Sequence, residues 1–148
     1  MKWVTREQIR VNRTATCWLV RRFIDPAAEL VFVAPTDVAS FQVQQEAIGF
    51  DAPDAIYPHK DRQGLCSFAA LVRERFSDND VLMEMARIVQ AADFKEQLDD
   101  HPAARGLQLI SHGFPAVTEN DYETAERAGF LYDALYASIE QQTERNRV

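Results

Sequence analysis

The chain has 148 residues, 47% of them hydrophobic and 26% charged, which is the composition of a globular protein large enough for a proper core. Its formal net charge of −7 argues against non-specific binding to nucleic acids or anionic membranes, because such binding needs a basic surface. The N-terminus lacks the apolar segment of a signal peptide, and no apolar run approaches the ~20 residues of a membrane-spanning helix. We therefore expect a cytoplasmic protein that binds neither membrane nor nucleic acid directly.

Apolar patterns predict a small sheet in the N-terminal half of the chain. Residues 1–5 can form a strand, and the continuous apolar run Leu30–Val33 predicts a second strand that is buried on both faces. A helix over residues 37–47 should follow and end at Gly49. Prolines confine residues 50–58 to sheet edges or loops.

Apolar positions at helical spacing predict four helices in the C-terminal half. They begin near Ser67, Asp80, Pro102 and Asp121, and the third of them should end at residues 112–115. We therefore expect a helix-rich α+β fold. It should be a single domain over residues 1–148, with a small N-terminal-half β-sheet packed on several helices.

The segment from Asn12 to Pro26 predicts one helix whose charges are unusual for their positions. Asn12 is a good N-cap residue, and Asp25 should end the helix because the residue before a proline is pushed out of helical geometry. Arg13 in the first turn and Asp25 in the last oppose the helix dipole, at a cost of up to roughly 1 kcal/mol each. Such exceptions to local rules often mark a functional site.

The polar face of this helix offers two contacts between residues one turn apart. Trp18 and Arg22 can stack, and Arg21 and Asp25 can pair. Two interpretations stay open at this point. Either the face lines a site, or Arg21 simply neutralises Asp25 while Arg13 is solvated.

The sequence lacks glycine-rich phosphate loops and the common metalloprotease and hydrolase signatures, so whether it is an enzyme stays open. Its polar residues instead predict an oxyanion site, since arginine forks bind tetrahedral oxyanions and a histidine adds a charge-assisted donor. The candidate ligands are Arg6, Arg13, Trp18, Arg21, Asp25 and His59. The alternative is a divalent metal ion held by Asp25, His59 and Asp93, because carboxylates and imidazole suit manganese, zinc or iron.

Several of these residues also have a plainer interpretation. His59 can be a structural loop histidine, Asp93 a helix-end residue and His112 a residue that flanks a helix. Cys17 and Cys66 have no metal-binding spacing and should be reduced packing residues. A third possibility is a structural or homodimeric module that uses the last helix as its partner surface.

The sequence blocks together form a pattern that covers nearly the whole chain. The run N-R-T-A-T-C-W-L-V-R-R-F-I-D-P from Asn12 matches D-R-x-A-x-x-W-L-I-R-R-F-I-D-P. Further matches follow in order, namely F-D at Phe50, His59, C-S-F at Cys66, I-V-x-x-A-D at Ile88 and L-Y-D-A-L-Y at Leu131. In these features the chain resembles the ChrB-type chromate-resistance family.

The resemblance implies a cytoplasmic bacterial domain linked to chromate resistance. Together with the cations at the start of the first helix, it leads us to expect a domain that senses or binds a chromate-like oxyanion through an Arg/His pocket. In longer relatives this domain forms the C-terminal half of a chromate-responsive transcriptional regulator. Because the present chain begins directly at the shared block, we expect it to lack a DNA-binding portion. It departs from the family pattern at Asn12, where the family has Asp, at Thr16-Cys17, where it has Cys-Pro, and at Ala69 and Ala103, where acidic residues are common. The missing carboxylates argue against a metal site more than they argue against an oxyanion site built from arginine and histidine.

Overall fold

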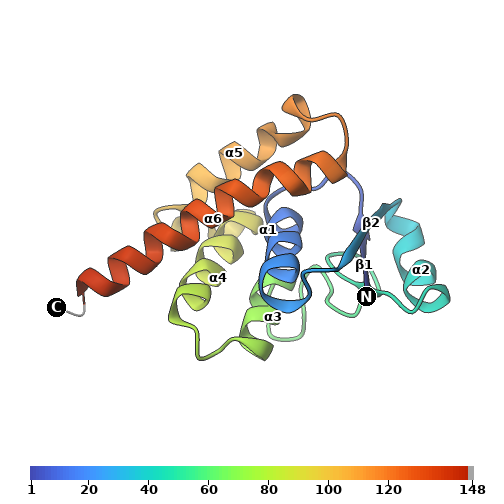
Figure 1. Ribbon diagram of the computed structural model, residues 1–148, viewed down its shortest axis with the longest axis horizontal. Helices are drawn as coiled ribbons and strands as arrows, with labels where there is room; N and C mark the ends of the chain where they lie inside the picture. Colours follow the sequence, from blue (N-terminus) through green and yellow to red (C-terminus); the bar gives the residue numbers. More distant parts are fainter. Residues whose placement is uncertain (147–148) are drawn as a thin grey trace.

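The computed structural model describes residues 1–146, so the last two residues of the expected domain lie outside the described part (Figure 1). The strands are β1 (Lys2–Arg6), β2 (Glu29–Val33) and β3 (Ile48–Gly49). The helices are α1 (Val11–Leu19), α2 (Val38–Gln44), α3 (Ser67–Arg75), α4 (Asp80–Asp93), α5 (Ala104–Val117) and α6 (Asp121–Asn146). A π-helical segment (Val20–Ile24) extends α1, and 3-10 segments precede α2 (Pro35–Asp37) and α5 (Lys95–Asp100). The expected helix-rich α+β class is confirmed.

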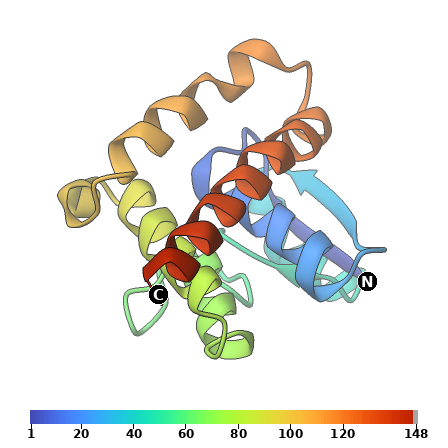
Figure 2. The same ribbon diagram turned by 60° about the vertical axis from the view of Figure 1, so that its left-hand side comes forward.

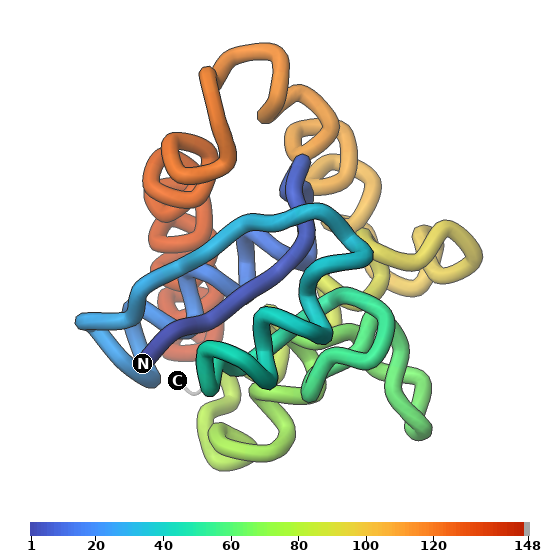
Figure 3. The backbone as a smooth tube through the Cα atoms, turned by 90° about the vertical axis from the view of Figure 1, so that its right-hand side faces the viewer, coloured from blue at the N-terminus to red at the C-terminus, as the bar shows by residue number. Residues whose placement is uncertain are grey.

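The three strands form a parallel sheet in the order β2-β1-β3. Trp3 in the central strand pairs with Leu30 on one side and Ile48 on the other. Parallel neighbours need a crossover connection, and α1 supplies it between β1 and β2. Figure 3 shows β1 and β2 side by side with α1 running behind them.

Side chains of the sheet alternate between two apolar cores, because successive residues of a strand point to opposite faces. Trp3 belongs to the large core, which α1, α3, α4 and α6 share. Val4 belongs to a small core with Val38 of α2. The prediction for Leu30–Val33 is therefore only partly right. Both faces of β2 meet apolar side chains, but β2 is an edge strand and only Leu30 among those four is fully buried.

Helix α1 lies at the centre of the helical layer and contacts α3, α4, α5 and α6. Figures 1 and 2 show α6 running across α1, while α5 diverges from α6. The hydroxyl of Tyr132 in α6 is fully buried against α1, 3.0 Å from the carbonyl of Val11 and 2.7 Å from the hydroxyl of Thr14. Cys17 and Cys66 are free and buried, as expected. Among the described residues, no helix is long and apolar enough to cross a membrane.

Asn12 does not cap its own helix, which corrects the prediction made for it. Helix α1 begins at Val11, after Arg10. The buried amide of Asn12 instead reaches the start of α3, where its Oδ1 accepts a bond from the N–H of Phe68 at 3.1 Å and its Nδ2 donates to Ser67 at 2.9 Å. Asn12 thus caps α3 from outside and ties the two helices together.

Two predicted helix ends are also wrong. Helix α2 ends at Gln44, and Gly49 lies in β3, where a side chain would collide with the amide of Gln42 that accepts the Gly49 N–H at 2.9 Å. Helix α5 does not stop at residues 112–115 but continues through Pro115 to Val117. The first predicted helix therefore ends before its expected stop signal, and the second continues past its own.

Candidate functional site

Charged side chains from four segments meet at the carboxyl end of β1. They are Arg6 from the end of β1, Arg13 from the first turn of α1, Asp51 and His59 from the loop after β3, and Asp93 from the end of α4. The carboxyl edge of a parallel sheet is where many α/β folds bind ligands. The sequence indicated four of these residues, and the tertiary structure gathers them around Asp51, which it did not indicate.

Asp51 is the centre of this cluster, and its carboxylate is only 3% exposed. It lies 2.7 Å from Nδ1 of His59, 3.3 Å from Arg6 and 3.4 Å from Arg13. The backbone carbonyl of Asp51 also accepts a bond from Nε of Arg6 at 2.7 Å. Burial raises the pKa of Asp51, but the hydrogen bond from His59 and the charges of the two arginines outweigh burial and hold this pKa below its ordinary value. Asp51 is therefore ionised at neutral pH.

Asp93 has the opposite character. Its Oδ2 atom is buried, has no hydrogen-bond partner within residues 1–146 and lies 3.9 Å from Nδ1 of His59. Burial and the negative charge of Asp51 raise the pKa of Asp93 to about 7, although His59 and the arginines oppose this rise. The hydrogen bond to Asp51 raises the pKa of His59. Near neutral pH the cluster thus holds one ionised carboxylate, Asp51, and one whose protonation changes with pH in this range, Asp93.

Arg13 is the most buried cation of the cluster, with a side chain only 11% exposed. Its Nη2 donates to the carbonyl of Gln8 at 2.7 Å, and its Nε is buried without a hydrogen-bond partner in the described part of the chain. Burial lowers the pKa of Arg13 and Asp51 raises it, but the guanidinium remains charged at any physiological pH. One buried donor of Arg13 is therefore left without an acceptor among the described residues.

A small cavity of about 150 Å³ opens beside these side chains, and we call it the charged pocket. Its polar lining comprises Arg6, Arg10, Asn12, Arg13, Asp51, Asp93, Gln108 and His112, and Val11 and Ala92 complete it. His59 contacts Asp51 and Asp93 but does not itself line the pocket. Gln108 and His112 were not expected here, although they lie one turn apart on α5 and so share a face. The sequence did contain a signal for Arg10, because Arg6, Arg10 and Arg13 form a run of cations that precedes and opens the first helix.

Asp25 does not join the cluster. Its carboxylate lies 3.4 Å from the N-terminal amine of Met1 and accepts the N–H of Ala27 at 3.0 Å. Met1 precedes β1 and Arg6 ends it, so about 16 Å of extended strand separates Asp25 from the charged pocket. The expected metal set of Asp25, His59 and Asp93 is thus not assembled. Within residues 1–146 no group of three or more His, Cys, Asp and Glu residues is arranged to hold a metal ion.

Trp18 and Arg21 lie in a separate hollow of about 270 Å³ between α1 and α6. Trp18 donates its indole N–H to Asp133 at 2.8 Å, and Arg22 lies 2.9 Å from the same oxygen. The guanidinium of Arg22 lies 5.6 Å from the centre of the Trp18 ring, which confirms the expected stacking. The expected pair of Arg21 and Asp25 does not form, because Asp25 binds Met1 instead. Through Asp133, Trp18 and Arg22 connect the first helical segment to α6, and neither they nor Arg21 line the charged pocket.

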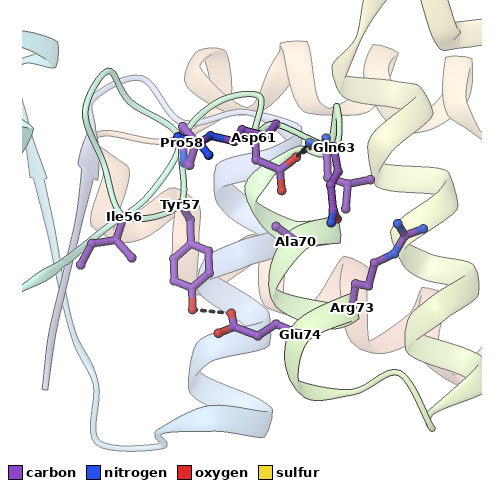
Figure 4. Close-up of a pocket in the computed structure, with 10 residues that line it drawn as sticks. Ile56, Tyr57, Pro58, Asp61, Gln63, Ala70, Arg73 and Glu74 are labelled. Carbon is purple, nitrogen blue, oxygen red and sulfur yellow. Dashed lines mark hydrogen bonds between the residues drawn. The ribbon is translucent and has the colours of Figure 1, made fainter.

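Another hollow, about 530 Å³, lies between the 56–65 loop and α3 (Figure 4). The phenol of Tyr57 donates to Glu74 across it at 2.7 Å, as Figure 4 shows. Asp61 accepts the N–H groups of Gln63 and Leu65 within its own loop. This hollow contains none of the residues that the sequence indicated and neither of the unpartnered buried atoms of Arg13 and Asp93. The charged pocket is therefore the stronger candidate site.

Comparison with known proteins gives two matches. The sequence profile of the family described as ChrB, C-terminal domain, matches residues 3–139. Protein ChrB of Cupriavidus metallidurans is 30% identical over 148 residues, an alignment that covers 97% of this chain and 42% of that protein. The chain thus spans less than half the length of this relative. No solved structure matches the chain significantly.

Proposed function

The chain belongs to the family of ChrB C-terminal domains, and from this premise we propose that it is a chromate-resistance domain whose charged pocket binds a small oxyanion such as chromate. In this proposal the domain is a sensor of the ion, and the arginines at the carboxyl end of β1 and the start of α1 are its ligands. The charges, size and hydrogen-bonding capacity of the pocket each support the proposal.

The balance of charge in the pocket favours an anion. Arg6, Arg10 and Arg13 contribute three positive charges, and only Asp51 opposes them with a full negative charge at neutral pH. Asp93 adds at most a part of a second negative charge, since its pKa is about 7. The pocket is therefore a locally positive place on a chain whose net charge is −7, and such a local field attracts anions.

The size of the pocket fits a tetrahedral oxyanion. About 150 Å³ corresponds to roughly five water molecules at about 30 Å³ each, which is room for a central atom with four oxygens. Val11 and Asn12, the first two residues of α1, form part of the wall. A helix N-terminus adds to the attraction for anions because its first N–H groups have no partners within the helix.

The observation that carries the proposal is the unpartnered Nε of Arg13. Buried polar atoms without partners are uncommon and each costs about 1–3 kcal/mol. A bound anion supplies an acceptor to this donor and to the arginines beside it, in the forked geometry that guanidinium groups prefer. In this arrangement His59 acts indirectly, since its bond to Asp51 holds the carboxylate that positions Arg6 and Arg13.

Arg10→Ala is the cleanest variant for a binding experiment. Arg10 is exposed and makes no ion pair within residues 1–146, so its loss should leave the fold intact. We expect chromate affinity, measured by isothermal titration calorimetry, to fall about tenfold, which corresponds to the loss of one charge-assisted hydrogen bond.

Arg21→Ala is the matched control, because it removes an exposed arginine of the π-helical segment Val20–Ile24, outside the charged pocket. Its chromate affinity should equal that of the unaltered chain. Equal affinities of the Arg10→Ala and Arg21→Ala proteins, or no binding of chromate by the unaltered chain, would contradict the proposal.

A further inference from the structure

The two carboxyl groups of the charged pocket, those of Asp51 and Asp93, differ in their hydrogen-bond partners. Asp51 is occupied by His59, Arg6 and Arg13, whereas Oδ2 of Asp93 is buried in the same cluster without any hydrogen-bond partner in the described part of the chain. An ionised carboxylate beside a bound oxyanion repels it unless a proton lies between the two oxygens. The position of Asp93 therefore bears on which oxyanions the pocket accepts.

We propose, building on the proposed function, that Asp93 makes the pocket selective for oxyanions that carry a proton, such as hydrogen chromate or hydrogen phosphate, over fully deprotonated ones such as sulfate. In the complex the free oxygen of Asp93 and one oxygen of the ligand share a single proton. Asp93 is thus a specificity-determining residue of the anion site.

The proton balance explains the selectivity. A protonated oxyanion brings the shared proton with it and donates its O–H to ionised Asp93. Sulfate brings none, so Asp93 must first take one proton from solvent and then donate its own O–H to the anion. Both complexes contain one proton in the same place, but only the sulfate complex requires proton uptake.

The surroundings of Asp93 set the pH at which this difference appears. The charged and titratable groups that act on it are Asp51, His59, Arg13 and Arg6, and the pocket wall adds Arg10 and His112. Burial and Asp51 bring the pKa of Asp93 to about 7. Above that pH the protonated form of Asp93 becomes rarer by a factor of about ten per pH unit, and sulfate affinity should fall by the same factor. Affinity for a protonated oxyanion gains no such dependence from Asp93.

Calorimetry at pH 8 with the whole chain tests this inference, using sulfate and hydrogen phosphate as probes of the same tetrahedral shape. Titrations in buffers of different ionisation enthalpy count the protons taken up on binding. Sulfate binding should take up about one proton more than hydrogen phosphate binding, and hydrogen phosphate should bind about tenfold more tightly. Because the same His59 titrates in both experiments, its contribution cancels in the comparison.

Asp93→Asn removes the titration while keeping the shape of the side chain. In this variant the extra proton uptake with sulfate should disappear, and sulfate affinity should no longer fall between pH 7 and pH 8.5 more steeply than phosphate affinity. Asp99→Asn is the control, since Asp99 is 87% exposed and pairs with Arg105 outside the pocket. Folding of the variant is checked by urea unfolding at pH 8. There Asp93→Asn should be more stable than the unaltered chain, because a raised carboxyl pKa means that ionisation opposes folding.

The outcomes separate this inference from the proposed function. Equal affinities and equal proton counts for sulfate and hydrogen phosphate in the unaltered chain would overturn the role of Asp93 while leaving oxyanion binding intact. So would an Asp93→Asn protein that keeps the extra proton uptake. If chromate, phosphate and sulfate all fail to bind the unaltered chain, the proposed function fails and the inference fails with it.

Discussion

Replacement of Asp51 by asparagine is expected to destabilise the fold by about 3–5 kcal/mol, because it leaves the buried guanidinium of Arg13 without its counter-ion. The side chain of Arg13 is only 11% exposed. Its other hydrogen-bond partner, once the charge of Asp51 is removed, is the carbonyl of Gln8. Asparagine suits the backbone here, since Asp51 has a φ of 50°, a left-handed conformation that Asn tolerates. The change therefore isolates the charge. Urea unfolding at pH 7 measures the loss.

Asp25→Asn is the matched control for Asp51→Asn. Asp25 pairs with the exposed amine of Met1, so removing its charge should change the free energy of unfolding by less than about 1 kcal/mol. A loss in Asp51→Asn no larger than in this control would refute the central role of Asp51.

The effect of Asp51 should also depend on pH. The pKa of Asp51 is held below its ordinary value of 3.8, so its stabilisation is fully present above that pH and is lost as the pH falls through the lower folded-state pKa. The difference in unfolding free energy between the unaltered chain and Asp51→Asn should therefore shrink below about pH 4. A difference that grew on acidification would contradict the assignment.

Asn12→Ala is expected to cost about 2–4 kcal/mol, the second largest effect. The change removes the acceptor of the Phe68 N–H at the start of α3 and the donor to the Ser67 hydroxyl, both in a site where Asn12 is only 1% exposed. An unpaired Phe68 N–H costs about 1–3 kcal/mol, and the Ser67 hydroxyl keeps only its 3.3 Å contact with the hydroxyl of Thr16. Thermal and urea unfolding followed by circular dichroism measure the loss.

Asn12→Asp distinguishes capping of α3 from simple loss of volume. Its carboxylate keeps an acceptor for the Phe68 N–H, can accept the Ser67 hydroxyl and places a negative charge near the N-terminus of α3. We expect it to cost at least 1 kcal/mol less than Asn12→Ala. Equal losses in the two variants would show that Asn12 is not a cap of α3.

The sequence alone predicted those elements and contacts that depend on a local pattern of residues. The apolar stripe between Val81 and Ala92 predicted a helix that begins near Asp80, as α4 does, and Pro26 correctly predicted the end of the first helical segment at Ile24–Asp25. The stacking of Arg22 on Trp18 also followed from spacing alone, because residues four apart on a helix are neighbours whatever else the chain does. Spacing did not predict the π-helical segment.

Local sequence patterns could not predict contacts between segments that are distant in the chain. Asn12 had the chemistry of an N-cap, and the sequence could not tell that the helix it caps begins 55 residues later at Ser67. Asp25 and Asp93 looked equivalent as acidic residues at helix ends. The direction of β1 separates them, because its start lies beside Asp25 and its carboxyl end lies beside Asp93.

The sequence by itself determined the helix-rich α+β class, most element positions, the family and four members of the charged cluster, because each depends on local patterns or on recognisable blocks. Only the tertiary structure decided that Asp51 is the centre of the cluster, that Gln108 and His112 complete the pocket, and that Trp18, Arg21 and Asp25 lie elsewhere. The physical reason is that burial and charge pairing depend on which chain segments meet. The pKa of Asp51 is lowered, and that of Asp93 is raised, only after β1, α1 and α4 have packed around these two residues.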